Sequence, residues 1–369
     1  MNIVLVGGQE IPGIGGTEAY MLNLAKELCK QGHNATIICS GRKPYETTID
    51  NVKIIHKVCP KSNIIALPLL FFKSLGYITK NCKDIDVVNF QSIFMAFIPG
   101  WISSTFGCRA YYTIHSLAED NPKHGRILKF LMKVVAFISI WLCGNNIITI
   151  SNSKSAEIKK RYGKKCTVIP CGINASNSTI ETDILKRFSI RKGAYYLTIG
   201  RIDPVKNLDT LIKAFIKHNS SDKQLVIAGN YENEHGKHLK ENAKGNKNII
   251  FTGIVMGDDK ETLIRNCYAN CLVSSSEGMP ISLLEAMIHA KPNIVTDIPA
   301  IREIMENDWG YWCKVQDRDS LCSQMEQIEN EYSLAKEKGI IMKEYVTNNN
   351  LWEIVTERYI HYLNSIRAI

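Results

Sequence analysis

The sequence predicts an α/β protein with two doubly wound parallel-sheet domains in tandem and a helical C-terminal tail. Short β-branched runs alternate with helical patterns, a polar break follows residue 170, and the alternation then begins again. Strands and helices in this order are typical of parallel sheets covered on both faces. A length of 369 residues fits two domains of about 150 residues each. The 45% apolar and 22% charged content is typical of a soluble globular protein.

The elements follow from the spacing of apolar residues along the chain. In the first half we expect strands at 3–6, 35–39, 52–55, 86–90, 110–114, 146–150 and 167–169, and helices at 17–31, 64–80, 94–106, 125–143 and 152–162. In the second half we expect strands at 195–199, 224–228, 248–252, 270–274, 293–296 and 310–313, with helices between them and a wholly helical tail at 318–366.

The polar break sets the domain boundaries. The stretch PCGINASNSTIE begins at residue 170 and is poor in large apolar residues, which is typical of a linker. We therefore expect an N-terminal domain at 1–172, a linker at 173–190, a C-terminal domain at 191–348, and a helix at 349–369 that packs back on the N-terminal domain. Ligands of such sheets bind beyond the carboxyl ends of the strands, so the cleft between the two domains is the expected active site.

The cysteines and the start of the chain indicate a cytoplasmic protein. None of the twelve cysteines forms a C-x-x-C pair or has a spacing typical of zinc ligands, so we expect reduced thiols. The chain opens directly with the strand MNIVLV, so we expect no signal sequence.

The charge is concentrated in the first half of the chain. Residues 1–180 contain 21 Lys+Arg and 10 Asp+Glu, a balance of +11 within a net charge of +9. No nucleic-acid-binding motif accompanies this charge, so we expect an anionic membrane surface as the partner. The apolar stretches 63–80 and 126–144 carry Lys73, Lys129 and Lys133, and neither is long enough without charges to span a bilayer. They are interfacial helices or buried core helices of the domain.

Two glutamates flank a turn in EGMPISLLEAM, residues 277–287. Pro280 suits the first turn of a helix, so Glu277 lies just before a helix N-terminus and Glu285 lies about two turns along it. A loop carboxylate beside unpaired backbone N–H groups suits a ligand with hydroxyls and negative charge, such as a nucleotide sugar. Alternatively, Glu277 only stabilises the helix dipole and Glu285 lies on a solvated face.

Two cations follow the first strand of the second domain, in GRIDPVKN. Arg201 comes directly after Gly200, and Lys206 lies five residues further on, before a helix. Two cations at the carboxyl end of a strand can clamp a diphosphate, and Pro204 stiffens the loop that spaces them. The alternative is a pair of solvated surface cations. It is weakened because Glu277 and Glu285 are expected at the same sheet edge.

The first domain offers a glycine pair and a histidine. Gly15 and Gly16 precede a helix, where a backbone without side chains can approach a phosphate or sugar. Their spacing does not match the dinucleotide fingerprint, and a plain tight turn is the alternative. His115 follows a strand and could donate to a sugar hydroxyl or phosphate, or it could be a structural loop residue. We consider three residues of the same loop less favoured as ligand contacts than His115: Asp120, Lys123 and His124.

Together, these motifs resemble the retaining glycosyltransferases of family 4, which have the GT-B architecture of two facing Rossmann-like domains. The segments that carry the resemblance are GIGGTEAYMLNLAKELCKQGHNATI, VIPCGI, GRIDPVKNLDTLIKAF, VIAGN, IIFTG and EGMPISLLEAMIHAKPNIVTDIPAIREI. The segments QEIPGIGGTE and TIHSLAEDNPKHGRILKF look most like the bacterial cell-surface polysaccharide branch that includes rhamnosyltransferases. That branch often has H-G-L-D-W-x-R-x-K-W-G where this chain has HSLAEDNPKHG, so the donor sugar and the acceptor stay open.

The resemblance implies a role for each motif residue. Arg201 and Lys206 would hold the donor diphosphate, Glu277 the sugar hydroxyls and Glu285 the ribose. Gly16 would approach the phosphates or the acceptor, and His115 would contact the transferred sugar. The remaining donor-binding positions would be Gly15, Gly200, and the backbone of Gly278, Met279, Pro280 and Ile281.

The expected activity is hexosyl or deoxyhexosyl transfer with retention, from a nucleotide diphosphate sugar to a hydroxyl. The acceptor would be a lipid-linked saccharide of O-antigen, capsule or exopolysaccharide, met at the inner face of the cell membrane. No D-x-D motif follows a strand at the cleft, so no metal ion or other cofactor is expected. The oligomeric state is not indicated. The alternatives are an epimerase or phosphorylase of the same fold, a catalytically silent sugar-nucleotide-binding protein and, more weakly, a nicotinamide oxidoreductase.

Overall fold

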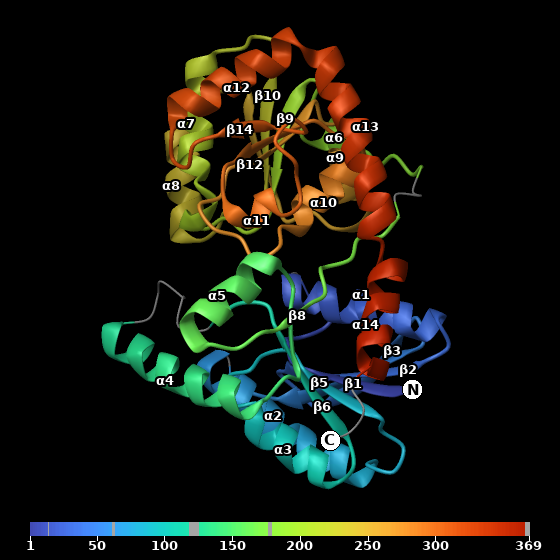
Figure 1. The fold of residues 1–369 in the computed structure, drawn as a ribbon. Helices are drawn as coiled ribbons and strands as arrows, with labels where there is room; N and C mark the ends of the chain where they lie inside the picture. Colours follow the sequence, from blue (N-terminus) through green and yellow to red (C-terminus); the bar gives the residue numbers. More distant parts are fainter. Residues whose placement is uncertain (14, 61–62, 118–124, 176–178, 366–369) are drawn as a thin grey trace. The chain divides into compact units, whose positions relative to one another are not determined.

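The computed structural model describes residues 1–13, 15–60, 63–117, 125–175 and 179–365. They form two compact units (Figure 1). The first unit contains residues 1–172 together with the C-terminal segment from Trp352, and the second runs from Ile173 to Leu351. Each unit has its own parallel sheet and its own core.

The first unit has a sheet of eight strands in the order β3-β4-β2-β1-β5-β6-β7-β8. The strands are β1 (Asn2–Val6), β2 (Asn34–Gly41), β3 (Tyr45–Ile49), β4 (Val52–Val58), β5 (Val87–Phe90), β6 (Arg109–Ile114), β7 (Ile147–Thr149) and β8 (Thr167–Val168). The helices are α1 (Gly16–Lys30), α2 (Asn63–Lys80), α3 (Phe97–Thr105), α4 (Arg126–Leu142) and α5 (Asn152–Tyr162). All pairings are parallel except that of β3 with β4.

The second unit has a six-stranded parallel sheet in the order β11-β10-β9-β12-β13-β14. The strands are β9 (Tyr195–Ile199), β10 (Gln224–Ala228), β11 (Ile249–Gly253), β12 (Ala269–Leu272), β13 (Asn293–Thr296) and β14 (Tyr311–Cys313). The helices are α6 (Ile184–Arg187), α7 (Leu208–His218), α8 (Glu234–Asn242), α9 (Gly257–Asn266), α10 (Ile281–Ile288), α11 (Pro299–Arg302), α12 (Arg318–Asn330) and α13 (Tyr332–Asn349). The neighbours of β9 are β10 on one side and β12 on the other.

Alternating side chains on β9 show why this sheet needs helices on both faces. Tyr195 and Leu197 belong to one buried cluster and Tyr196 belongs to another. Successive side chains of a strand point to opposite faces, so both faces of β9 are covered. The cluster around Tyr196 includes apolar residues of α7 and α12, two helices that pack together.

The segment predicted as a linker, 173–190, is folded into the second unit. It contains the short helix α6, whose Ile184 is fully buried beside β9. The polar stretch is therefore followed by α6, which is anchored in the core of the second unit before the sheet begins.

The last helix, α14 (Trp352–Ser365), belongs to the first unit. A Cβ on Gly172 would lie 2.3 Å from the Trp352 ring, and Tyr20 meets that ring edge-on at 5.4 Å. Further along α14, the Tyr359 hydroxyl accepts a hydrogen bond of 2.7 Å from the Asn89 side chain. The predicted continuous helical tail is thus three helices, broken around residues 331 and 350.

Among the described residues, no helix has both the length and the apolar content that crossing a membrane requires.

Candidate functional site

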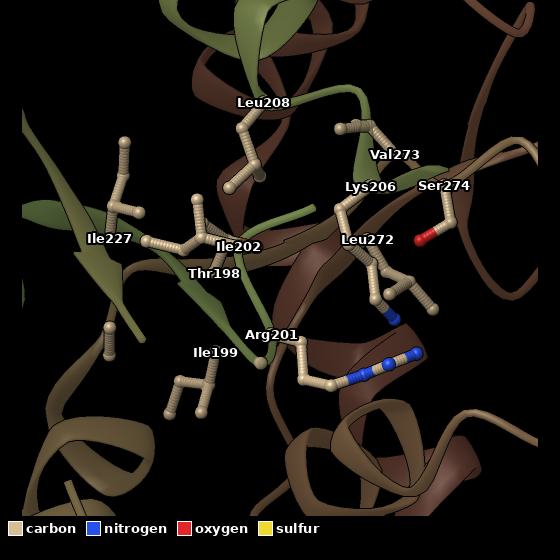
Figure 2. A pocket seen from close by; sticks show the side chains of 12 residues that line it. Thr198, Ile199, Arg201, Ile202, Lys206, Leu208, Ile227, Leu272, Val273 and Ser274 are labelled. Carbon is tan, nitrogen blue, oxygen red and sulfur yellow. The ribbon is translucent and has the colours of Figure 1, made fainter. Parts of the chain in front are cut away.

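A pocket opens at the carboxyl ends of three neighbouring strands of the second unit, β9, β10 and β12 (Figure 2). It is lined by Thr198, Ile199, Gly200, Arg201, Ile202, Lys206, Leu208, Ile227, Ala228, Leu272, Val273 and Ser274. Strand order reverses between β9 and β12, which is where doubly wound sheets bind ligands. The pocket is shallow and partly open to solvent, so a ligand there would lie across the strand ends.

The loop after β9 is held in place by backbone geometry. Gly200 has φ +155°, and a Cβ on Gly229 would lie 2.1 Å from the Gly200 carbonyl oxygen, so both positions require glycine. The loop then forms a short 3₁₀ turn over Pro204–Lys206 and reaches Asn207, which has φ +50°. The Asn207 side chain donates to the Val273 carbonyl at 3.0 Å, which ties the loop to the end of β12.

Lys206 and Glu277 meet at this edge. The Lys206 Nζ lies 2.6 Å from Glu277 Oε1, with side chains only 18% and 12% exposed. The Ser274 hydroxyl donates to the same Oε1 at 2.5 Å, and the Ser275 N–H donates to the Val205 carbonyl at 2.8 Å. The two loops therefore form one hydrogen-bonded unit, in which a cation and a carboxylate are fixed side by side.

Arg201 is the more accessible cation of the pocket. Its side chain is 78% exposed, and its Nη2 lies 3.5 Å from Asp203 Oδ2. Figure 2 shows the Arg201 guanidinium and the Lys206 amine directed to the same side of the pocket. An exposed guanidinium beside a paired ammonium can take up a diphosphate, because Arg201 needs little rearrangement to reach it.

The turn after Glu277 differs in detail from the sequence prediction. Pro280 is the N-cap residue that precedes α10, rather than part of its first turn. Glu285 lies about one turn into α10, not two, because the helix begins only at Ile281.

Glu285 is not on a solvated face. Its side chain is 14% exposed, and its Oε1 lies 2.5 Å from Lys260 Nζ of α9. Burial raises the pKa of the Glu285 carboxyl, and the Lys260 ammonium opposes that shift. Neither Glu277 nor Glu285 lines the pocket itself, but Glu277 pairs with the lining residue Lys206, whereas Glu285 pairs with Lys260.

Gly15 and Gly16 occupy the start of α1 in the first unit, and they differ in their surroundings. A Cβ on Gly15, the N-cap residue, would overlap Glu18 Oε2. Glu18 in turn accepts a hydrogen bond of 2.7 Å from the Gln9 N–H, so Gly15 has a structural reason to be glycine. Apart from its chain neighbours and the nearby backbone of α1, no described atom lies within 4 Å of a Cβ placed on Gly16, which leaves open space there.

His115 lies just beyond β6 in the same unit. Its Nε2 is 2.9 Å from the Gln91 amide oxygen, and Tyr20 meets its ring edge-on at 4.8 Å. Burial lowers the pKa of the His115 ring to about 4, so the ring is neutral. Because an amide oxygen only accepts, Nε2 carries the proton and Nδ1 is the hydrogen-bond acceptor of the ring. A neutral ring with one acceptor nitrogen is suited to a hydroxyl group more than to a phosphate. Asp120, Lys123 and His124 lie outside the described residues.

Sequence reasoning missed the residues that hold the pocket together. Ser274 and Asn207 fix the two loops, and Lys260 pairs with Glu285. Polar residues directly after a buried strand, as in CLVSSSEG, were a usable signal for Ser274. No pattern in the sequence links Lys260 to a glutamate on another helix.

Comparison with known families gives two matches, one in each half. The model of glycosyltransferase family 4 matches residues 14–177, and the model of glycosyl transferases group 1 matches residues 180–345. Together, the two matches support a glycosyltransferase, and the two parallel-sheet units have the GT-B fold. This confirms the predicted fold and the predicted enzyme class.

Relatives support the same family at low identity. An uncharacterised glycosyltransferase of Methanocaldococcus jannaschii is 24% identical over 95% of this chain and 92% of its own. The O-antigen chain mannosyltransferase C of Escherichia coli is 23% identical over 88% of this chain and 87% of its own.

Solved structures share the fold. Sucrose-phosphate synthase of Thermosynechococcus elongatus has a TM-score of 0.80 at 16% identity, and 99% of each chain is covered. HepE of Anabaena, solved with UDP and glucose, has a TM-score of 0.79 at 16% identity over 99% of this chain and 100% of its own.

Proposed function

We propose that this glycosyltransferase moves a sugar from a nucleotide diphosphate sugar to a saccharide hydroxyl in cell-surface polysaccharide synthesis, with retention at the anomeric carbon. The observation that carries the proposal is the cluster of Arg201, Lys206 and Glu277 at the switch point of the second sheet. The names of two relatives support the pathway class: an O-antigen chain mannosyltransferase, and a galactosyltransferase whose acceptor is a sugar diphosphoundecaprenol.

The donor diphosphate acquires negative charge as its bond to the sugar breaks. In our proposal, the exposed Arg201 guanidinium binds the diphosphate. The Lys206 ammonium interacts with the diphosphate as well as with Glu277. Glu277, held by Ser274, then accepts hydrogen bonds from sugar hydroxyls. Preorganised cationic hydrogen-bond donors such as Arg201 and Lys206 contribute on the order of 10²-fold or more to turnover. The two cations supply the positive charge that a metal ion would otherwise provide, so we propose transfer without a metal.

The acceptor side depends on α4, which we propose as the membrane-contacting helix. Ile127 is 80% exposed, Phe130 66% and Trp141 60%, an apolar surface that water does not favour. Lys129 and Lys133 lie on the same helix, and Lys164 stands 5.0 Å over the Trp141 ring. Apolar side chains mixed with lysines fit the headgroup region of an anionic bilayer. A lipid-linked acceptor would be met there, at the inner face of the cell membrane.

The other candidate helix, α2, is less suited to this role. Leu70, Phe71, Ser74 and Ile78 are all fully buried against the sheet of the first unit. The two lysine-bearing apolar stretches thus have different surroundings in the structure, and the membrane proposal rests on α4.

A vesicle assay tests the membrane proposal. The protein should sediment with anionic vesicles and not with neutral ones, and 1 M salt should release it, because the screening length falls to about 3 Å. Replacing Lys129 and Lys133 with glutamate should weaken binding, and so should Phe130→Ser. Ile340→Ser, at an equally exposed apolar position on α13 (61%), is the matched control. If vesicle binding does not depend on lipid charge, or is unchanged by substitution of all three α4 residues, a soluble acceptor becomes the better explanation.

Donor screening tests the reaction itself. Thermal unfolding with a panel of UDP-, GDP- and dTDP-sugars should single out one donor, because a ligand bound to the native state raises stability by mass action. Arg201→Ala should remove that shift and the transfer activity, whereas Lys244→Ala, an exposed pair with Glu241, should leave both intact. Product analysis separates the alternatives. An isomerised nucleotide sugar or a free sugar phosphate, formed without any acceptor, would favour an epimerase or phosphorylase.

A further inference from the structure

Three side chains with metal-ligating atoms gather on the outer side of the second unit. His218 is the last residue of α7, and Cys322 and Glu326 are on α12, one helical turn apart on one face. One ligand atom from each lies within 4.8 Å of the others. The helices α7 and α12 pack together (Figure 1), so the cluster joins two elements that are distant in sequence.

His218 is oriented as a metal-binding histidine is. Its side chain is only 6% exposed, and its Nε2 lies 3.0 Å from Glu329 Oε1. The carboxylate of Glu329 also accepts a hydrogen bond of 2.8 Å from the Tyr196 hydroxyl, which holds it in place. In the described structure His218 Nδ1 is buried and has no hydrogen-bond partner. A carboxylate that accepts a hydrogen bond from one ring N–H leaves the lone pair of the other ring nitrogen for a cation.

Cys322 and Glu326 supply the other two ligands. Cys322 is 3% exposed, and its Sγ lies 3.6 Å from Glu326 Oε1, a long contact for a thiol hydrogen bond. Glu326 is exposed, so its carboxylate can move toward an ion. One nitrogen, one sulfur and one oxygen ligand suit Zn²⁺, whereas Mg²⁺ and Ca²⁺ require oxygen ligands.

We propose that His218 Nδ1, Cys322 Sγ and the Glu326 carboxylate bind one Zn²⁺ ion, with water as the fourth ligand. On binding, the Cys322 thiol loses its proton to solvent and coordinates as the thiolate. The site goes beyond the proposed transfer reaction. It lies at the opposite end of α7 from Leu208 of the pocket, about 15 Å away along ten residues. Its effect is to clamp α7 to α12.

Metal titration of the full chain tests the site. Protein stripped with a chelator and then freed of it should bind one Zn²⁺ per chain, measured by calorimetry. Co²⁺ in place of Zn²⁺ should give a near-ultraviolet thiolate-to-metal absorption band. Cys322→Ser should abolish that band, and His218→Ala should weaken binding at least tenfold. Cys166→Ser, at a half-buried cysteine of the first unit, should leave both unchanged.

Glu326→Gln keeps the test available if the buried variants do not fold, because position 326 is exposed. It should lower zinc affinity while leaving the metal-free melting temperature unchanged. The proposal is overturned by the absence of stoichiometric zinc, by a cobalt complex without the thiolate band, or by zinc binding that survives all three substitutions. Because the donor assay does not involve this site, failure here leaves the proposed transfer function standing.

Discussion

Replacing Lys206 with methionine should lower both the turnover and the stability of the protein. If Lys206 were a solvated cation, its loss would leave unfolding unchanged. The structure instead places its ammonium 2.6 Å from Glu277, with both side chains more than four-fifths buried. Methionine fills a similar volume without charge, so the Lys206→Met variant leaves a largely buried carboxylate with the Ser274 hydroxyl as its hydrogen-bond donor.

The expected cost follows from that burial. Removing one partner of a fully buried ion pair costs about 3–5 kcal/mol. Here the pair is partly open to solvent and Ser274 remains, so we expect a loss of about 1–3 kcal/mol of unfolding free energy. Replacing both residues, as Lys206→Met with Glu277→Gln, removes the unpaired charge. The double variant should therefore recover about 1–2 kcal/mol relative to the sum of the single variants.

Urea unfolding and donor turnover should be measured on the parent protein, the two single variants and the double variant. Together, the two measurements separate the structural role of Lys206 from its role in catalysis. Stability should return in the double variant, whereas turnover should stay at least 10²-fold low because the diphosphate has lost its cation. Lys192→Met, which breaks an exposed pair with Glu181, is the control and should change neither measurement. Unchanged urea unfolding together with turnover within threefold of the parent would refute both the pairing and the donor-site assignment.

Three further predictions concern metal, packing and pH. Chelation with EDTA should leave the transfer rate within about twofold, and a loss that only Mg²⁺ or Mn²⁺ restores would show that a metal stabilises the leaving group. The Trp352→Ala variant should lose about 3–5 kcal/mol of unfolding free energy, because the ring packs on Gly172 and Tyr20. The control Trp101→Ala, at a 71% exposed position, should lose far less, and equal losses would contradict this packing. Burial lowers the pKa of His115 to about 4, below the unfolded value of about 6.5, so the unfolded chain binds the extra proton and stability falls by about 2.5 kcal/mol from pH 6.5 to 4. The His115→Gln variant should flatten that part of the stability curve, and an unchanged curve would assign the titration to another group.

The sheet could be predicted because its strands are buried on both faces. Runs such as YYLTI and QLVIA are nearly continuous in apolar residues, which distinguishes them from the helices around them. The missed strand, β3, reads YETTI and is largely exposed at the sheet edge, where no apolar run is needed. Its pairing with β4 depends on backbone hydrogen bonds that leave no mark on composition.

The site could be predicted only to the level of the sheet edge. Carboxyl ends of parallel strands meet at one edge, so the motifs around Lys206 and Glu277 were expected together, and the structure pairs them. The partner of Glu285 could not be predicted, because it depends on the rotation of α10 against α9, which brings Lys260 to face it. Spacing along one helix does not determine how a neighbouring helix is turned.

The two lysine-bearing apolar stretches, α2 and α4, also show that composition does not determine how a helix packs. Their compositions are alike, yet α2 packs against β1, β2 and β4, whereas α4 packs on α5 and buries only one narrow stripe that includes Ala136 and Ile140. A helix that covers several strands can bury a wide apolar surface, but α4 is left with large side chains in water. These exposed side chains add nothing to the core of the unit, and an exposed apolar surface of this kind is typical of an interaction site. The partner that we propose is a bilayer interface, because one such surface can bury the rings and keep the lysine ammonium groups at the lipid phosphates.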